Sequence, residues 1–275
     1  MHVEVAVVPA AGRGTRMDPA TRVVPKALLP LVDRPALQWV LEEAVAAGAR
    51  ELVVVVSPGV DDLITSHFEG MGGLHRIEAL QGVHLRWVVQ STPRGLGDAV
   101  LQTRDAVAGR PFFCLLGDNI MPPGVPCLAT LGGVSDGRSV TAMRPMSAEE
   151  TRSYGIARLG GWLADDVVEV IGAVEKPGPD SAPSDLGFLG RYLFTDEIFA
   201  LLAGLEPGHG GEVQLTDAID ALAARGRCLG AVIASDPLDV GNPASYLEAV
   251  TVLGLAHRAT GARYRAFLES LLDRP

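Results

Sequence analysis

Residues 3–16 read VEVAVVPAAGRGTR, and this stretch decides the fold. The almost continuous apolar run over 3–9 is typical of a parallel β-strand that is covered on both faces. Gly12 and Gly14 follow in a turn where such a strand would end, and backbone N–H groups in a turn of this kind can approach phosphate oxygens. Arg16 adds positive charge at the same place. The stretch predicts a strand that leads into an anion-binding turn, with a purely structural turn as the alternative.

The rest of the first half continues with buried strands and amphipathic helices. Further apolar strands are predicted over 51–57, 84–90 and 112–116, and helices over 35–47 and 96–107. This βαβ repetition indicates a parallel, doubly wound sheet.

After about residue 135 the pattern changes to strand-like stretches separated by Gly and Pro turns, an arrangement from which sugar-sized pockets are often built. These strands are predicted over 139–143, 156–159, 167–175, 187–194 and 229–234, with helices over 213–224 and from 243 onwards. We expect one domain over 1–275 with three parts: a nucleotide-binding half (1–135), a sugar-binding half (136–242) and C-terminal helices (243–275). The two halves are expected to share one sheet.

The composition restricts the class of protein. Of the 275 residues, 48% are hydrophobic and 20% are charged, which excludes a disordered chain. The net charge of -10 and the 5% aromatic content argue against a nucleic-acid partner. No apolar run reaches the roughly 18 residues of a membrane helix, and the N-terminus lacks the basic start of a signal peptide. We therefore expect a cytoplasmic protein with no membrane partner.

Lysine is rare in this chain. Of the 23 basic residues, only Lys26 and Lys176 are lysines. A compact ammonium can approach a phosphate oxygen where the planar guanidinium of arginine does not fit. The two lysines are therefore candidates for phosphate contacts, with chance retention as the alternative.

Gln90 and Gly95 belong to the run QSTPRGLG, which follows the strand predicted over 84–90. A glutamine side chain offers both a donor and an acceptor, which suits the imide edge of uracil or thymine, and glycine lets a flat base lie against the backbone. The alternative is a helix-entry turn with a solvated glutamine.

Two aspartates are predicted at strand ends. Asp118 follows the strand over 112–116 in the run LLGDN, and Asp239 lies in DPLDVG. Ligands of open α/β sheets bind at the carboxyl ends of strands, and two carboxylates completed by substrate phosphates are a usual Mg²⁺ shell. We expect Mg²⁺ as the cofactor here, although either aspartate alone is more often a turn or cap residue.

The run VEKP at 174–177 places a carboxylate and an ammonium side by side at the end of a strand. A proline after the strand can turn both side chains toward one pocket. Glu175 would then accept hydrogen bonds from sugar hydroxyls, and Lys176 would meet a sugar phosphate. The alternative is a surface ion pair.

Seven motifs, in this order, resemble those of the bacterial UTP–glucose-1-phosphate uridylyltransferases, also called UDP-glucose pyrophosphorylases. They are AGRGTRMDPATRVVPKALLPLVDRP (11–35), GLGDAV (95–100), YGI (154–156), VEKP (174–177), GRY (190–192), GEVQLTDAI (211–219) and DVGN (239–242). The resemblance implies a Rossmann-like three-layer α/β/α fold of the nucleotide-diphospho-sugar transferase type, with a mixed, mostly parallel central sheet and a β-rich, sugar-binding insertion. It also implies the condensation of UTP with glucose 1-phosphate to UDP-glucose and pyrophosphate, and a homodimer or homotetramer.

Carried over position by position, the resemblance implies a role for each matching residue. Nucleotide binding falls to Ala11, Gly12, Gly14, Thr15, Gln90 and Gly95, and phosphate contact and catalysis to Arg16, Lys26 and Lys176. Mg²⁺ falls to Asp118 and Asp239, and the sugar to Gly155, Glu175 and Lys176.

The sequence also departs from the family pattern. Arg13, Arg22 and the Ala27-Leu28 pair differ from the usual residues, and the run LGDN at 116–119 resembles the related thymidylyltransferases more closely. A thymidylyltransferase that uses dTTP is therefore the alternative within this class. A non-catalytic protein that binds a sugar nucleotide is the alternative outside it.

Overall fold

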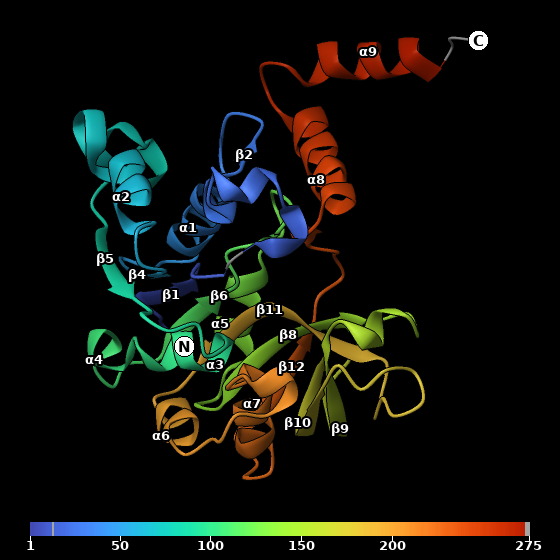
Figure 1. Ribbon diagram of the computed structural model, residues 1–275. Helices are drawn as coiled ribbons and strands as arrows, with labels where there is room; N and C mark the ends of the chain where they lie inside the picture. Colours follow the sequence, from blue (N-terminus) through green and yellow to red (C-terminus); the bar gives the residue numbers. More distant parts are fainter. Residues whose placement is uncertain (13, 273–275) are drawn as a thin grey trace.

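The computed structural model describes residues 1–12 and 14–272, and within them a sheet of nine strands forms the centre of the molecule (Figure 1). Across the sheet the strands follow the order β5 (His84–Val89), β4 (Glu51–Val56), β1 (Val5–Pro9), β6 (Phe112–Leu115), β11 (Leu186–Phe194), β8 (Ser139–Pro145), β12 (Cys228–Val232), β10 (Val167–Glu175) and β9 (Gly155–Ala164).

The N-terminal part of the sheet is parallel, as the sequence pattern predicts. β1 lies between β4 and β6 and is parallel to both, and β5 extends the sheet beyond β4 in the same direction. Val5, Val7 and Val8 are fully buried, and burying a side chain of this size contributes roughly 1.5–3 kcal/mol. The chain runs outward from β1 to β4 and β5 and returns to β6, so the strand order reverses between β1 and β6.

The remaining strands make the sheet mixed. β11 is antiparallel to β6 and β8, β12 is parallel to β8, and β10 is antiparallel to β12 and β9. Because β11 pairs directly with β6, strands from before and after residue 135 share one sheet. The predicted α/β fold with a mixed central sheet is confirmed. The division into a nucleotide half and a sugar half stays a prediction.

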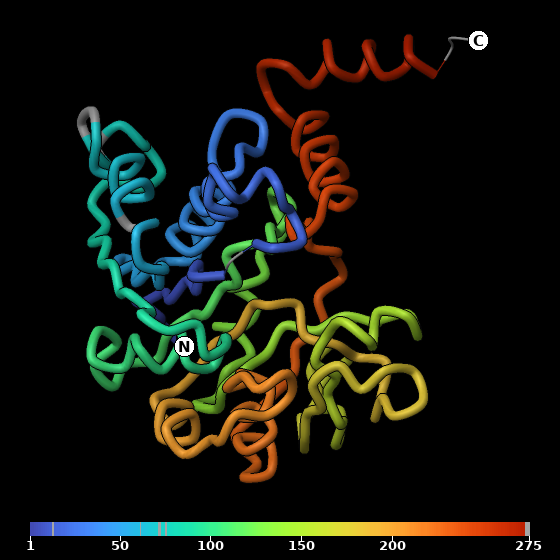
Figure 2. Tube along the Cα trace, viewed as in Figure 1, coloured from blue at the N-terminus to red at the C-terminus, as the bar shows by residue number. Residues whose placement is uncertain are grey.

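Helices cover both faces of the sheet, which gives three layers (Figures 1 and 2). One face packs against α1 (Ala36–Ala46), α2 (Asp61–Glu69) and α5 (Cys127–Val134). The other face packs against α3 (Leu96–Leu101), α4 (Arg104–Val107), α6 (Glu197–Ala203) and α7 (Leu215–Ala223). Two short strand pairs lie outside the sheet: β2 (Pro30–Leu31) with β3 (Arg34–Pro35), and β7 (Asn119–Ile120) with β13 (Leu238–Asp239).

Several segments differ from the sequence-based expectation, which includes no helix at the positions of α5 and α6. The helix predicted over 96–107 is divided into α3 and α4 at Thr103, whose Oγ1 donates to the backbone oxygen of Val100 at 2.7 Å. Such local side-chain bonds compete with helix continuation. Residues 58–83, where the pattern predicts no element, contain α2 and several 3₁₀ turns.

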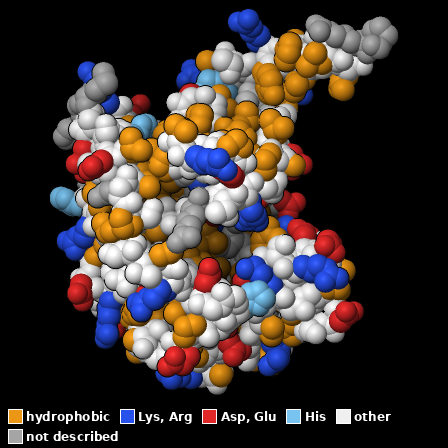
Figure 3. Space-filling model, in the orientation of Figure 1, with side chains coloured by type: hydrophobic (Ala, Val, Ile, Leu, Met, Phe, Trp, Pro, Cys, Tyr) orange, Lys and Arg blue, Asp and Glu red, His pale blue; other side chains and the backbone are white. Residues whose placement is uncertain are grey.

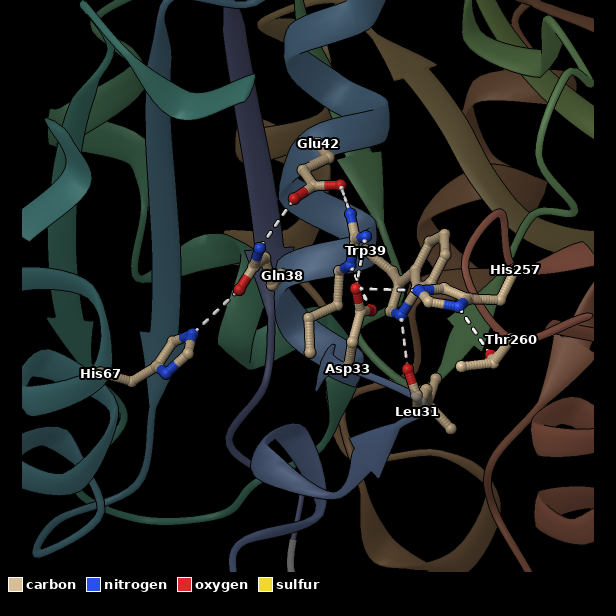
Figure 4. A network of polar contacts seen from close by, with 9 residues as sticks. Leu31, Asp33, Gln38, Trp39, Glu42, His67, His257 and Thr260 are labelled. Atoms are coloured by element: carbon tan, nitrogen blue, oxygen red, sulfur yellow. Dashed lines mark hydrogen bonds and ion pairs between the residues drawn. The ribbon is translucent and has the colours of Figure 1, made fainter. Parts of the chain in front are cut away.

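The C-terminal helices α8 (Pro243–Ala256) and α9 (Gly261–Leu272) form an arm that extends away from the sheet (Figure 1). The Tyr246 hydroxyl donates to the backbone oxygen of Pro30 at 2.7 Å, and Nε2 of His257 lies 3.3 Å from Oδ2 of Asp33. Figure 4 shows that the polar network around His257 and Asp33 continues to Glu42, Gln38 and His67. These contacts join the arm to the β2–β3 hairpin. None of the helices in the described ranges has the length and apolar character needed to cross a bilayer.

Candidate active site

A cleft opens at the carboxyl end of the sheet where the strand order reverses, which is the usual ligand position in open α/β sheets. Its cavity has a volume of about 530 Å³, and the space-filling view shows a hollow near the centre of one face with charged side chains at its rim (Figure 3). The predicted site residues that line it are Ala11, Gly12, Gly14, Thr15, Lys26, Gln90, Gly95 and Asp118. Turns that lie far apart in the sequence therefore meet in one cavity.

The glycine-rich turn after β1 packs against the segment that follows it, which includes Thr21 and Lys26. Gly14 has φ +63°, and a Cβ on it would lie 3.0 Å from Cγ2 of Thr21 and 3.2 Å from Cβ of Lys26. Any other residue would be strained by the backbone angle and would crowd both side chains. Thr21 Oγ1 also donates to the backbone oxygen of Gly14 at 2.9 Å. This packing brings Lys26 to the turn, while Arg13 lies outside the described residues.

Lys26 and Asp118 form an ion pair inside the cleft. Nζ of Lys26 donates to Oδ2 of Asp118 at 2.6 Å, and the lysine side chain is only 11% exposed. The ammonium is therefore held in a partly dry cavity, where its charge is screened less than it would be in water.

The backbone of the Asp239 turn is hydrogen-bonded to the backbone at Asp118. In the β7–β13 pair Asp239 is opposite Asn119, and the N–H of Val240 donates to the backbone oxygen of Asp118 at 3.0 Å. Oδ2 of Asp239 accepts from Ser245 Oγ at 2.9 Å, which orients the carboxylate. Two carboxylates separated by about half of the chain are thus brought together, although Asp239 itself does not line the cavity.

Arg16 lies beside the same turn. A Cβ built on Gly241 would be 2.7 Å from Oδ1 of Asp239 and 3.1 Å from Nη2 of Arg16. Arg16 is exposed and, like Asp239, does not line the cavity.

The donor set fits a divalent cation that is completed by a ligand. Asp118 and Asp239 offer hard carboxylate oxygens from adjacent backbone positions. Within residues 1–12 and 14–272 no group of three or more His, Cys, Asp or Glu residues is arranged to hold a metal alone. Mg²⁺ is usually bound in this way, by one or two carboxylates together with substrate phosphates and water.

Gln90 and Gly95 line the cleft from the turn that follows β5. The Gln90 side chain is buried, and its Nε2 donates to Oδ2 of Asp98 at 2.7 Å and to the backbone oxygen of Gly95 at 3.2 Å. Gly95 has φ +112°, and a Cβ on it would lie 2.7 Å from the backbone oxygen of Val213. The glycine is therefore needed for packing against residue 213, whatever it contributes to a bound base.

The residues predicted to bind the sugar are placed next to one another but outside the lining of the cavity. Oε1 of Glu175 lies 3.0 Å from Nζ of Lys176, and Oε2 accepts from Thr216 Oγ1 at 2.6 Å. Gly155 is opposite Glu175 in the β9–β10 ladder. Lys176 has φ +47°, so the chain turns sharply at the end of β10.

A backbone hydrogen bond from Lys176 and the negative charge of Asp239 both act on Tyr154. The N–H of Lys176 donates to the backbone oxygen of Tyr154 at 3.1 Å. Burial, and next the negative charge of Asp239, raises the pKa of the Tyr154 hydroxyl above its usual value. Tyr154 is therefore bonded to the backbone of Lys176 and is affected by the charge of Asp239.

Several residues that shape the site were not singled out from the sequence. Asp98 holds Gln90, Thr21 holds Gly14, Ser245 holds Asp239 and Thr216 holds Glu175; Glu212 lines the cavity. Asp98, Thr21, Thr216 and Glu212 belong to the recognised motifs, but their hydrogen-bond partners lie in other turns, so their function required the structure.

The fold and the cleft define an α/β protein in which a glycine-rich turn, a lysine and an aspartate line one cleft. The chain belongs to the nucleotidyl transferase family, whose model matches residues 5–254. The chain is 36% identical over 287 residues to UTP–glucose-1-phosphate uridylyltransferase 2 of Streptococcus pyogenes serotype M3, covering 98% of this chain and 96% of that protein. The UTP–glucose-1-phosphate uridylyltransferase of Streptococcus pneumoniae is 37% identical, with 93% and 91% covered.

Solved structures agree with this family. A UDP-glucose pyrophosphorylase complexed with UDP-glucose superposes with a TM-score of 0.83 at 30% identity, covering 90% of this chain and 97% of that one. The UTP-bound UGPase of Acinetobacter baumannii superposes with a TM-score of 0.84 at 28% identity, with 98% and 99% covered.

Proposed function

We propose that this protein is a UTP–glucose-1-phosphate uridylyltransferase, which transfers the uridylyl group of UTP to glucose 1-phosphate and releases pyrophosphate. The observation that carries the proposal is the Lys26–Asp118 pair, which lies in a cleft between a glycine-rich turn and Gln90. This arrangement suits a nucleoside triphosphate. The relatives named UTP–glucose-1-phosphate uridylyltransferase support the choice of substrates.

The backbone of residues 11–15 and Lys26 would bind the triphosphate. An ammonium has three N–H donors, and Lys26 gives one of them to Asp118. The other two remain for phosphate oxygens. Arg16 would add charge beside the Asp239 turn.

We assign Mg²⁺ to Asp118 and Asp239, which would share it with the triphosphate. When bound, the cation neutralises the charge on the phosphate oxygens. Ser245 and the N–H of Gly241 hold the Asp239 carboxylate, and Lys26 holds that of Asp118, so the two acceptors are oriented in advance.

Glucose 1-phosphate would bind on the Asp239 side, its hydroxyls at Gly155 and Glu175 and its phosphate at Lys176. A phosphate monoester has a second pKa of about 6, so its oxygen is already a nucleophile near neutral pH and needs no general base. The oxygen attacks the α-phosphorus of UTP in line, and pyrophosphate leaves. The residues of the cleft act by holding two mutually repelling anions in contact and by neutralising their charge.

The proposal is tested by measuring pyrophosphate release with UTP or dTTP, crossed with glucose 1-phosphate or galactose 1-phosphate, with and without Mg²⁺. We expect the highest turnover with UTP, glucose 1-phosphate and Mg²⁺. A clear preference for dTTP would identify a thymidylyltransferase instead. Binding of UDP-glucose without pyrophosphate release in any combination would identify a non-catalytic sugar-nucleotide protein.

We further propose a cytoplasmic homodimer or homotetramer in which residues 1–275 act as one unit. Light scattering coupled to size-exclusion chromatography would test the assembly, and a monomer with full activity would contradict it.

A further inference from the structure

Both hydrogens of the Gln90 side-chain amide are donated to acceptors of the protein itself. One is donated to Oδ2 of Asp98 at 2.7 Å and the other to the backbone oxygen of Gly95 at 3.2 Å. Among the described residues no donor bonds to Oε1 of Gln90, and this oxygen is also not among their buried atoms that lack a partner. Because Gln90 lines the cavity, Oε1 is the polar atom that it offers to a ligand.

Asp98 can hold Gln90 in one orientation only. Its side chain is 3% exposed, and a carboxylate accepts hydrogen bonds but donates none. Rotation of the Gln90 amide by 180° would bring Oε1 against the Asp98 carboxylate and the Gly95 carbonyl, which are both acceptors. The buried acceptors would then lose their hydrogen bonds.

The other oxygen of Asp98 is fixed as well. Oδ1 accepts from Nη2 of Arg94 at 2.6 Å and from its Nε at 3.1 Å, and Nε2 of Gln102 lies 3.4 Å away. Arg94 is donor-only and reaches Asp98 from the surface, since its side chain is 62% exposed. Arg94, at the surface, therefore bonds to the Asp98 carboxylate, and Asp98 bonds to the Gln90 amide in the cleft.

We propose that Asp98 is a positioning residue for nucleobase selection: it fixes the Gln90 amide so that the cleft presents a hydrogen-bond acceptor to the base. This inference rests on the proposed function. Uracil and thymine carry a donor, N3–H, on their imide edge, which matches Oε1. The N3 atom of cytosine is an acceptor, so CTP, which has the same size as UTP, meets an acceptor and is rejected. Asp98 thereby determines the base without touching it.

Asp98→Asn tests the proposal because it keeps the shape of the side chain. Arg94 still requires an oxygen, so the amide introduced at position 98 places its NH₂ group against Gln90. In its original orientation the Gln90 NH₂ group now meets this NH₂ group, and after a 180° turn Oε1 meets the Gly95 carbonyl. Neither orientation is held any longer, so in part of the molecules Gln90 presents its NH₂ group to the cleft. We expect the ratio of kcat/KM for UTP to that for CTP to fall by roughly 2- to 12-fold, which is the factor that one ordinary hydrogen bond contributes.

Two further variants separate this effect from a general loss of structure. Arg94→Ala keeps the acceptor-only carboxylate at position 98, so the ratio stays at the wild-type value. In the double variant Arg94→Ala/Asp98→Asn, the amide oxygen at position 98 is free to turn toward Gln90, and the ratio returns toward the wild-type value. A purely structural function of Asp98 would lower turnover with both nucleotides alike and would give no rescue.

A folded Asp98→Asn protein, judged by its melting temperature, with an unchanged ratio would overturn the proposal. If this variant does not fold, Asp98→Ala, which removes the acceptor for the Gln90 amide, is measured in the same way, and an unchanged ratio overturns the proposal equally. Binding of UTP and CTP by isothermal titration calorimetry gives the same comparison without catalysis. Wild-type protein that binds UTP in preference to CTP but releases no pyrophosphate would refute the proposed function and leave the inference about Asp98 standing.

Discussion

Replacing Glu43 by Gln removes the charge that balances a fully buried arginine. Arg191 has no exposed surface, and its Nε and Nη2 donate to the Glu43 carboxylate at 2.7–3.1 Å. Burial opposes the charge of Arg191, but the charge and hydrogen bonds of Glu43 outweigh it and raise the pKa of Arg191. A guanidinium is not deprotonated in proteins, so the arginine stays charged in the variant as well.

The expected loss follows from that uncompensated charge. Removing one partner of a buried ion pair costs about 3–5 kcal/mol. Unfolding entropy is about 2.1 cal/mol/K per residue, so for the 275 residues of this chain the loss lowers the melting temperature by roughly 5–9 °C. Differential scanning calorimetry at neutral pH measures it.

Glu197→Gln is the matched control. Glu197 also pairs with an arginine, Arg227, but both side chains are more than 40% exposed, so the change is expected to stay within about 0.5 kcal/mol. Equal melting temperatures for Glu43→Gln and Glu197→Gln would refute the reasoning.

Three further outcomes are expected. Lys176→Ala raises KM for glucose 1-phosphate with little change in KM for UTP, and an unchanged KM for the sugar phosphate in steady-state kinetics would contradict its assignment. Burial raises the pKa of Cys114, Cys127 and Cys228 to about 12, so Ellman's reagent at pH 8 should label the native protein slowly and the denatured protein three times; rapid native labelling would show that a thiol is accessible. The hydrogen bond from Arg144, more than any other contact, lowers the pKa of Glu150 from 4.5 to about 2. A lowered pKa in the folded state stabilises the protein above pH 4.5, and this contribution is lost as the pH falls toward 2. In urea titrations the stability advantage of wild type over Glu150→Gln should therefore shrink between pH 4.5 and pH 2. A difference that stays constant over this range would contradict the lowered pKa of Glu150.

The parallel half of the fold was predictable because its strands are buried on both faces and read as apolar runs. β1, β4, β5 and β6 lie close to their predicted positions. α2 was not predicted, since its core residues, Ile64 and Phe68, are too few to give a helical pattern.

The site was predictable where residues follow the carboxyl ends of neighbouring strands. The turn after β1 and Asp118 after β6 meet for that reason. Asp239 required the structure, because its position depends on the β7–β13 pair of two residues each. The relation of Lys176 to the cleft depends on a left-handed backbone angle that no local pattern specifies for lysine.

The contacts of Arg191 with the loop around Asp118 could not be predicted from the sequence either. It lies in the recognised GRY motif, yet its Nη1 and Nη2 donate to the backbone oxygens of Leu116 and Asn119, on either side of Asp118. A buried arginine at this place holds the loop that carries the carboxylate, and only the β6–β11 pairing reveals the contact.

The central claim is that Lys26 places and neutralises the triphosphate in the cleft, and kcat of Lys26→Ala with saturating UTP, glucose 1-phosphate and Mg²⁺ tests it most directly. Losing one preorganised electrostatic group is expected to lower kcat by at least about 10²-fold, while the melting temperature changes little. Lys26→Arg keeps the charge but not the compact ammonium and should recover only part of the activity. A folded Lys26→Ala protein with wild-type turnover would contradict the account.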